Sequence, residues 1–501
     1  MEILRKLEKS RNFWFLLITS FFFFLLRLPS LFEPYWYGDE GIYQVLGNAM
    51  NQDRLLYRDI WDNKPPLLYF VYSLFNSDQF WVRLFSLMVG ALTVIAFYFL
   101  AKKLFEKERI VWITTALFAL LFGLPLLEGN IANAENFMLL PIIAAGYLVL
   151  QSLEYKIPAS PAGRRNTKYL ILFSSGALLG IAFLFKIVAV FDFGALLVFL
   201  ILADSSFSFK NLLKRKTLIL EIEKVTGFVI GFILPIILTA AVFLFNGALS
   251  YFIKAVLFSN VGYVGYGNNF IIPQGFLLLK LVILGLFCWL LYTKRKSLSF
   301  PLMFVWLWFA FSLFNAFFSQ RPYTHYLLTL LPAFCLLIGF FLFDKKRQRF
   351  TLLVLALTFI IVIKSFWFFA KFPFYYTNFI LFLTNQKSVS SYHAFFDKKT
   401  PIDYMLAEYI KLHTNPEDSI FIWGNNPQVY KLADKLPPGK YAAAYHITSY
   451  PDGVSNTKAG ILMKKPKLIV IMPNAGRIPF SLLNYREKIT IGNVLVYERI
   501  F

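Results

Sequence analysis

The sequence is poor in the residues that build disulfides, metal sites and charged surfaces. It has only 2 cysteines and 4 histidines, and charged residues make up 16% of its 501 residues. Cys288 and Cys335 both fall within apolar runs and the histidines show no metal-ligand spacing, so neither a disulfide framework nor a metal centre is expected. No Walker loop or dinucleotide fingerprint occurs, which argues against an ATP-driven pump. Soluble proteins carry roughly a quarter charged residues, so an ordinary soluble protein is excluded too.

Apolar residues dominate instead. They make up 58% of the chain, and phenylalanine alone occurs 59 times. Apolar runs of about 17 to 21 residues recur, and such helices are long enough to cross a hydrocarbon core of roughly 30 Å. We therefore predict a polytopic α-helical membrane protein with about eleven spans, the fifth and sixth separated by a turn near Lys186. The spans are expected near residues 13–31, 80–101, 110–127, 136–153, 169–185, 187–204, 225–245, 276–293, 299–318, 324–343 and 350–370.

The net charge of +22 does not indicate nucleic-acid binding, because the basic residues gather in alternate loops between the predicted spans. The positive-inside rule makes those loops cytoplasmic. The amino terminus is then inside, and eleven spans place the chain after about residue 371 outside. We expect a multi-pass protein of the plasma membrane. The basic loop residues are Arg5, Lys6, Lys9, Arg11, Lys102, Lys103, Lys107, Arg109, Lys156, Arg164, Arg165, Lys168, Lys210, Lys214, Arg215, Lys216, Lys224, Lys294, Arg295, Lys296, Lys345, Lys346, Arg347 and Arg349.

The long loop at residues 32–79 is the most informative outer segment, because loops of this length are usually functional or disordered and this one is rich in aromatic residues. It contains Asp39-Glu40 and, about twenty residues later, the stretch from Arg58 to Lys64-Pro65-Pro66. Spacing alone leaves two interpretations of the acidic pair open. It either performs chemistry, or Asp39 caps a helix that runs from Gly41 to Met50. Lys64 could likewise do no more than extend its charge to the membrane surface.

The tail from residue 372 to 501 has a different pattern, in which short helix-like and strand-like segments alternate. Helical periodicity is present at 402–412 and 426–436, and buried strands are expected at 419–424, 467–472 and 494–497. About 130 residues suffice for a small α/β domain with its own core. We therefore divide the chain into a membrane domain at 1–371, which includes the outer loop 32–79, and an extracytoplasmic α/β domain at 372–501.

Several motifs occur in an order that resembles one known family. They are Gly38-Asp39-Glu40-x-x-Tyr43, Arg58-Asp59-Ile60-Trp61-Asp62-Asn63-Lys64-Pro65-Pro66-Leu67, Trp81-Val82-Arg83-Leu84, Glu135-Asn136-Phe137-Met138-Leu139, the segment from Gly180 to Lys186, and Arg321-Pro322-Tyr323-Thr324-His325-Tyr326-Leu327-Leu328 with Leu331-Pro332. This order is similar to that of the protein O-mannosyltransferase and aminoarabinose transferase group, also described as glycosyltransferase family 39-like. Its members use polyprenyl-phosphate sugars and have the GT-C fold. The additional basic donor-binding residues of the aminoarabinose enzymes have no counterpart that we can place here, so aminoarabinose is not supported as the sugar.

The resemblance implies a GT-C membrane glycosyltransferase that moves mannose, another hexose or a pentose from a polyprenyl-phosphate donor to a hydroxyl of a lipid, glycan or protein acceptor. It places Asp39 in the catalytic centre with Glu40 beside it, and we expect Glu135 to flank the reacting atoms. Cationic and aromatic side chains at the outer face are the candidates for binding the donor phosphate and substrate, because a departing phosphate needs positive charge. These are Arg58, Lys64, Lys186, His325, Tyr326 and Tyr57.

No cofactor is expected, because a monophosphate leaving group can be stabilised by lysine or arginine. A divalent metal would be compatible with the chemistry, but the sequence offers no ligand set for it. The alternative function is a transporter or flippase, or a non-enzymatic binder, of polyprenyl-linked sugars. Transporters tend to show inverted repeats and interrupted midplane helices, neither of which is evident here.

Overall fold

The structure is a computed structural model that describes residues 11–154, 161–203, 210, 214–261, 275–319, 321–345 and 347–500. Arg5, Lys6, Lys9, Lys156 and Lys346 of the basic loops lie outside the described residues. The chain forms two compact units. The first consists of residues 1–28, 86–242 and 259–370, and the second of residues 29–85, 243–258 and 371–501.

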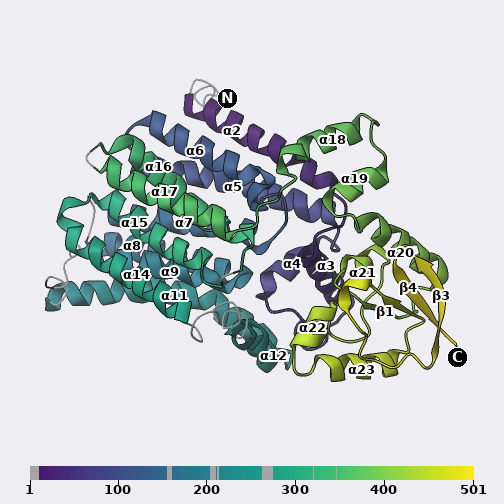
Figure 1. Cartoon of the computed structure of the whole chain (residues 1–501). Coiled ribbons are helices and arrows are strands. Elements are labelled where there is room, and N and C mark those ends of the chain that lie inside the picture. Colours follow the sequence, from purple (N-terminus) through teal and green to yellow (C-terminus); the bar gives the residue numbers. More distant parts are fainter. Residues whose placement is uncertain are drawn as a thin grey trace, which may run out of the picture. The chain divides into compact units, whose positions relative to one another are not determined.

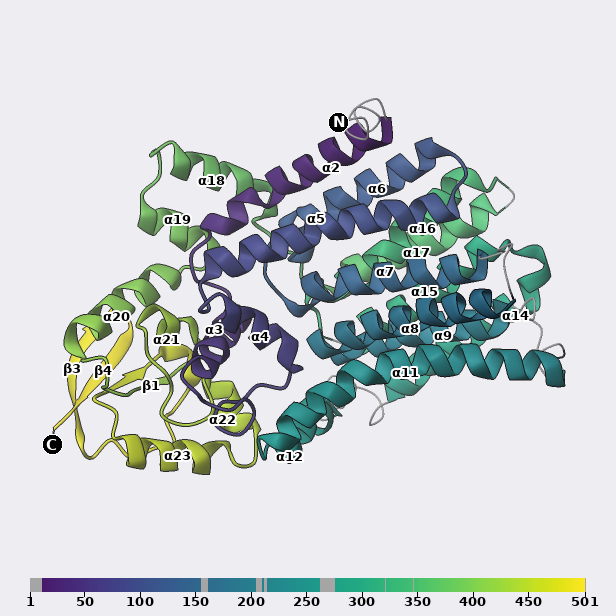
Figure 2. The same ribbon diagram turned by 180° about the vertical axis from the view of Figure 1, so that it is seen from behind.

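Long helices build the first unit, and in both views they run roughly side by side (Figures 1 and 2). Each of the eleven apolar segments predicted from the sequence is helical. An extended Lys186 separates α8 from α9, as the predicted turn requires. The helices are α2 (Arg11–Arg27), α5 (Gln79–Leu104), α6 (Glu108–Gly123), α7 (Ala134–Glu154), α8 (Pro161–Phe185), α9 (Val190–Ala203), α11 (Arg215–Phe245), α14 (Gly275–Lys294), α15 (Phe300–Ala316), α16 (Leu331–Phe343) and α17 (Gln348–Ser365), of which α5 and α11 continue into the second unit.

Within the described residues, seven helices are long and apolar enough to cross a membrane: α2, α5, α7, α8, α11, α14 and α17. The shorter apolar helices include α9, α15 and α16, whereas α6 falls in neither group. The protein is therefore a multi-pass membrane protein with a predominantly helical fold, as predicted. The count of eleven spans stays a prediction.

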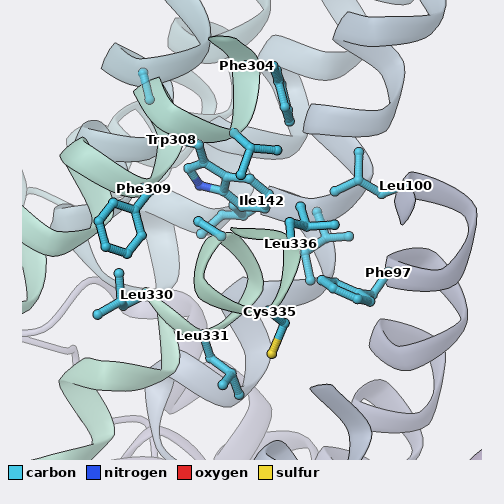
Figure 3. Packing of buried hydrophobic residues seen from close by; sticks show 14 of the residues in the cluster. Phe97, Leu100, Ile142, Phe304, Trp308, Phe309, Leu330, Leu331, Cys335 and Leu336 are labelled. Atoms are coloured by element: carbon cyan, nitrogen blue, oxygen red, sulfur yellow. The ribbon is translucent and has the colours of Figure 1, made fainter. Parts of the chain in front are cut away.

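Apolar side chains fill the interior of the first unit. Figure 3 shows Phe97, Ile142, Trp308 and Leu336 converging from four helices, and all four are nearly inaccessible. Glycine allows two of the helices to approach closely, because a Cβ atom at Gly180 of α8 would lie 2.4 Å from the carbonyl oxygen of Phe232 in α11. Such small-residue contacts are typical of helix packing in membranes.

The second unit combines the segment 29–85 with the carboxyl-terminal part of the chain. It contains a 3-10 helix, η1 (Leu28–Phe32), which begins in the first unit, and a π-helical turn at Lys254–Phe258. Its strands lie between α20 and α23 in both views (Figures 1 and 2). Its α-helices are α3 (Gly38–Met50), α4 (Pro66–Leu74), α12 (Leu249–Ile253), α18 (Tyr375–Leu383), α19 (Val389–Phe396), α20 (Thr400–His413), α21 (Gln428–Leu432), α22 (Ala444–Ser449) and α23 (Gly453–Lys464).

The four strands form one mixed sheet in the order β1-β2-β4-β3. Strands β1 (Ile420–Trp423) and β2 (Leu468–Ile471) are parallel, and β4 (Val494–Arg499) pairs antiparallel with both β2 and β3 (Tyr485–Ile491). The expected strands and the helix at 402–412 are confirmed by β1, β2, β4 and α20. The helix expected at 426–436 is shorter and corresponds to α21. Strand β3 was missed because most of its side chains are exposed, so it has no apolar alternation.

Candidate active site

The acidic pair lies in the first turn of α3, directly after Gly38. The N-cap residue of α3 is Tyr37, and no side chain makes the capping hydrogen bond, so the interpretation of Asp39 as the N-cap is wrong. A carboxylate within the first turn is still favoured by the positive end of the helix dipole. Asp39 keeps 39% of its side chain exposed. Its oxygens are therefore available for chemistry rather than committed to closing the helix end.

Asp39 is linked to Lys64, and Lys64 is linked to a second carboxylate. The Lys64 Nζ atom lies 3.7 Å from Asp39 Oδ2 and 3.6 Å from Asp62 Oδ2. The Tyr43 hydroxyl donates to Asp39 Oδ2 at 3.2 Å, and the same Nζ atom lies 4.8 Å from the centre of the Tyr43 ring. We call Asp39, Lys64, Asp62, Tyr43, Tyr69 and His446 the Asp39 cluster. It presents one partly exposed carboxylate beside one partly exposed cation.

The second carboxylate, Asp62, is buried and fixed on several sides. It accepts hydrogen bonds from the Tyr69 hydroxyl at 2.7 Å and from the Asn63 amide at 2.8 Å. Its Oδ1 atom lies 3.8 Å from Nε2 of His446. Burial acts to raise the pKa of Asp62, but the charge of Lys64 and the hydrogen bonds lower it overall below its ordinary value. Asp62 is therefore a fixed anion that holds Lys64 in place.

His446 comes from α22, far away in the sequence, and is buried against the same carboxylate. Burial lowers the pKa of His446 to about 4, so the imidazole is neutral near pH 7. Trp61 packs edge-on against it, with ring centroids 5.3 Å apart, and the Trp61 amide donates to the Lys440 carbonyl at 2.9 Å. The carboxyl-terminal segment thus covers the side of Asp62 that Lys64 leaves open.

The backbone around Lys64 is held by two buried tyrosines. The Tyr57 hydroxyl donates to the Lys64 carbonyl at 2.7 Å, and the Lys64 amide donates to the Tyr69 hydroxyl at 3.2 Å. Pro65 then caps α4 and Pro66 occupies its first turn, where a missing amide hydrogen costs nothing. Tyr57 is completely buried and helps to orient this loop, and its predicted contact with substrate stays a prediction.

Glu40 has a different environment from its neighbour. Arg83 of α5 contacts both Glu40 oxygens, and its Nη1 atom lies 2.9 Å from Glu33 Oε2. Tyr375 of α18 donates to the other Glu33 oxygen at 2.5 Å. All three charged side chains are nearly inaccessible. The structure therefore gives Glu40 a structural ion pair, and its predicted catalytic role stays a prediction.

Arg58 lies apart from the Asp39 cluster. Its guanidinium makes two hydrogen bonds, each of 2.8 Å, to its sequence neighbour Asp59, and 45% of its side chain is exposed. The structure gives it no contact with Asp39 or Lys64. Its predicted contact with the donor phosphate stays a prediction.

Close packing positions α3 within the second unit. A Cβ atom at Gly41 would lie 2.6 Å from the backbone nitrogen of Gln428, the first residue of α21. Only glycine permits this approach, and it follows the acidic pair directly. The carboxyl-terminal segment therefore supports the helix that carries Asp39.

The remaining predicted residues form a second group, within the first unit. Lys186 pairs with Glu135 at the start of α7, and its Nζ atom lies 4.2 Å from the centre of the Tyr326 ring. His325, in the 3-10 helix η6 (Thr324–Leu328), has Nε2 3.9 Å from Glu135 and Nδ1 2.9 Å from Glu128. We call Glu128, Glu135, Lys186, His325 and Tyr326 the Glu135 cluster. An ionisable group near the end of a membrane helix is a functional candidate by default.

Sequence reasoning missed five residues of these clusters, namely Asp62, Tyr43, Tyr69, Glu128 and His446. Asp62 lies two positions before Lys64 in a motif already singled out, and Glu128 directly follows the predicted span 110–127, so both had a local signal. His446 had none, because its partner lies in a distant part of the chain. Within the described residues, no group of three or more histidine, cysteine, aspartate and glutamate side chains could hold a metal ion.

Comparison with known proteins supports the resemblance. Residues 63–222 match the family model of dolichyl-phosphate-mannose-protein mannosyltransferases. This segment begins at Asn63, beside Lys64, and includes Glu135 and Lys186. No curated protein sequence matches the chain.

Solved structures resemble the protein over almost its whole length. ArnT from Cupriavidus metallidurans bound to undecaprenyl phosphate has a TM-score of 0.52 and 15% identity, and the match covers 97% of this chain and 98% of that chain. The apo state of the same protein gives a TM-score of 0.50 with 16% identity and the same coverage. AglB from Archaeoglobus fulgidus, in complex with an inhibitory peptide and a dolichol-phosphate, gives a TM-score of 0.48 with 12% identity, covering 93% of this chain and 69% of that chain. Residues 63–222 are thus similar to this mannosyltransferase family, and almost the whole chain shares the fold of ArnT.

Proposed function

We propose that the protein transfers a sugar from a polyprenyl-phosphate donor to an acceptor hydroxyl at the outer face of the membrane. The observation that carries this proposal is the geometry at the start of α3. There, a partly exposed carboxylate, Asp39, lies 3.7 Å from the cation of Lys64, which a buried carboxylate holds from the other side. A base beside a cation is what this transfer needs.

The proposed reaction joins the acceptor oxygen to the anomeric carbon of the sugar. Asp39 takes the proton of the acceptor hydroxyl as the oxygen attacks. The bond between the anomeric carbon and the phosphate oxygen breaks, and its electron pair leaves with the polyprenyl phosphate. Lys64 stabilises the negative charge that develops on this leaving group. No cofactor takes part in the proposed step.

The nature of the donor is supported by the relatives. The matching family model is described by its use of dolichyl-phosphate mannose, and ArnT was solved with bound undecaprenyl phosphate. We propose a donor of the same class, with mannose, another hexose or a pentose as the sugar. The acceptor is a lipid, glycan or protein hydroxyl outside the plasma membrane, where we also place the domain after residue 371.

We further propose that the Glu135 cluster binds the donor through Lys186. The side chain of Lys186 is only 15% exposed, and its ammonium group pairs with Glu135. His325 lies between Glu135 and Glu128, so its ring orientation is fixed on both sides. A phosphate would compete with Glu135 for Lys186, and Tyr326 would cover the cation from the other side. The predicted role of Glu135 beside the reacting atoms stays a prediction.

Substitution of Asp39 by asparagine tests the proposed function. Asparagine keeps the shape of the side chain but cannot accept the proton, so transfer should fall about 10²–10⁴-fold while folding is unchanged. We would compare envelope glycans by mass spectrometry in cells without the protein and in cells complemented with wild type or Asp39→Asn. Transfer rates would then be measured in membranes with the donor and acceptor that this comparison identifies.

Asp53→Asn is the matched control. Asp53 is an exposed aspartate just after α3, and its positive φ of 59° is well tolerated by asparagine. Cells complemented with Asp53→Asn should make the wild-type glycans, and this variant should transfer sugar at the wild-type rate. If Asp39→Asn also restores the glycans and transfers sugar at near wild-type rate, Asp39 is not the base. If membranes with the wild-type protein transfer no sugar at all, transport of a lipid-linked sugar becomes the better explanation.

A further inference from the structure

A short helical hairpin in the second unit exposes an apolar face. The hairpin consists of α18 and α19, which lie next to each other in both views (Figures 1 and 2). The rings of Phe382 in α18 and Tyr392 in α19 stack at 4.1 Å and hold the two helices together. The exposed apolar side chains are Phe374 (65%), Ile380 (57%), Leu383 (55%) and Val389 (57%). All four lie between residues 374 and 389, where exposed polar residues such as Thr377 and Thr384 accompany them.

The opposite face of α18 is unusually polar for a buried surface. Tyr375 and Asn378 are 2% and 3% exposed. The Tyr375 hydroxyl donates to Glu33, and the Asn378 side-chain oxygen accepts from Lys387. A helix on the surface of a soluble domain buries its apolar face and exposes its polar face. In α18, two polar groups are buried beside Phe379, whereas Ile380 and Leu383 are exposed.

Ring contacts place α18 at the level where two candidate spans end. Phe379 of α18 packs on Phe32 with centroids 5.6 Å apart, and Phe32 packs on Phe80 at 6.3 Å. Phe32 is the last residue of the candidate span Arg11–Phe32, and Phe80 lies in the first turn of the span Gln79–Leu104. The hairpin therefore lies beside the point where these two helices enter the bilayer.

The length and charge of the hairpin also fit a position on the bilayer surface. Helix α18 has 9 residues. At about 1.5 Å per residue it cannot cross a hydrocarbon core of roughly 30 Å. The sequence from 345 to 396 contains no aspartate or glutamate, whereas Lys371 precedes the hairpin and Lys387 lies in the connection between its two helices. Both ammonium groups lie 5.4 Å from the centre of the Phe395 ring. Positive charge without carboxylates suits anionic lipid head groups.

We propose that the α18–α19 hairpin is a membrane-surface anchor, whose apolar face lies among the outer acyl chains of the bilayer and whose lysines lie beside lipid phosphates. Helices of this kind lie in the plane of the interface. Tyr375 of α18 donates a hydrogen bond to Glu33, and Glu33 pairs with Arg83, which also pairs with Glu40 of α3. The anchor is thereby connected to the helix that carries Asp39. This role does not depend on which sugar the protein transfers.

Spin labelling of the full-length protein in nanodiscs tests the anchor. In a background with Cys288→Ala and Cys335→Ala, single cysteines would be introduced as Leu383→Cys and Leu412→Cys and labelled with a nitroxide. Leu412 lies on α20, is 75% exposed, and is the matched control on an ordinary surface helix. The nanodiscs would contain phosphatidylcholine and phosphatidylglycerol. The ratio of collisions with oxygen, which dissolves in lipid, to collisions with an aqueous nickel complex should be several-fold higher at position 383 than at 412.

Two results would overturn the proposal. One is a ratio of oxygen collisions to nickel-complex collisions that is the same at position 383 as at position 412, because the label at 383 would then be in water. The other is spin–spin broadening at 383 that disappears when labelled protein is diluted with unlabelled protein, because a second copy would then cover the face. Ile380→Cys repeats the measurement one turn earlier in α18 and should agree with 383. Thermal unfolding of each labelled protein checks that the substitutions leave the fold intact.

Discussion

Asp39 and Glu40 show how strongly the environment separates two adjacent carboxylates. Successive residues of a helix point about 100° apart, so the two side chains leave α3 in different directions. Asp39 meets Lys64 and keeps 39% of its side chain exposed, whereas Glu40 meets Arg83 and keeps 1%. A carboxylate that is completely paired inside the protein has little capacity to take a proton from a substrate. Of the two, Asp39 has the exposure and the partner that fit a base.

Lys64 should contribute strongly to donor binding if its charge meets the phosphate. Lys64→Met removes the charge while keeping the length of the side chain. A hydrogen bond to a charged group contributes about 1.5–3 kcal/mol, so the affinity for undecaprenyl phosphate should fall about tenfold or more. The change can be measured by native mass spectrometry of the purified protein titrated with that lipid.

Lys102→Met provides the comparison for this experiment. Lys102 is an exposed basic residue in the last turn of α5, and we assign it only a role in orientation. Its substitution should leave the affinity within about twofold of wild type, since surface substitutions away from a site usually cost little. Equal losses for the two variants would show that Lys64 acts through general electrostatic attraction and not by direct contact.

At the scale of elements, sequence periodicity predicts what is local and apolar. Every predicted apolar segment is helical, and the buried strands β1, β2 and β4 are where their apolar runs indicated. The exposed edge strand β3 carries Arg486, Glu487 and Lys488 and therefore gave no signal. In the site, Asp39 and Lys64 could be chosen from their motifs. The Glu40–Arg83 pair and the contact of Asp62 with His446 could not, because each depends on how distant segments pack.

The ion pairs of Arg83 should stabilise the association of α3 with α5. Arg83→Met would leave Glu33 and Glu40 buried without their cation. Breaking one partner of a buried pair costs about 3–5 kcal/mol, so the variant should unfold at a clearly lower temperature than wild type. Differential scanning fluorimetry in detergent measures this shift, and Arg54→Met tests whether loss of any arginine in this unit has the same effect.

Arg83→Lys refines the interpretation of that result. Lysine keeps the positive charge but cannot contact both carboxylates through a planar fork. The stability of the Arg83→Lys variant should therefore lie between those of wild type and Arg83→Met. If Arg83→Met unfolds at the wild-type temperature, the carboxylates of Glu33 and Glu40 do not need Arg83 for their stability. The structural role assigned to Glu40 would then be wrong.

For the whole molecule, the sequence suggested a membrane part followed by a separate tail, whereas the second compact unit contains both residues 29–85 and the tail. Two links are the Trp61 amide on the Lys440 carbonyl and the close approach of Gly41 to α21. Neither is visible in sequence, because backbone contacts between segments nearly 400 residues apart leave no periodic pattern. One consequence is that the tail is part of the framework around Asp39.

The orientation of the chain in the membrane is the remaining prediction at this scale. The seven long candidate spans found among the described residues and the eleven predicted from the sequence are both odd numbers, so either count would place the two ends of the chain on opposite sides. Both counts also place the loop between α5 and α6 on the side of the amino terminus. Lys102, Lys103, Lys107 and Arg109 around this loop make that side cytoplasmic. The carboxyl-terminal domain is then extracytoplasmic.

Labelling of single cysteines in intact cells tests this orientation. In the background without Cys288 and Cys335, Leu483→Cys lies in the carboxyl-terminal domain at a position that is 89% exposed, and Glu106→Cys lies in the α5–α6 loop at an exposed position. A membrane-impermeant maleimide should label position 483 in intact cells, but position 106 only after the membrane is permeabilised. The reverse pattern would put the carboxyl-terminal domain in the cytoplasm. Since that domain supports the helix of Asp39, the proposed transfer at the outer face would then have to be rejected as well.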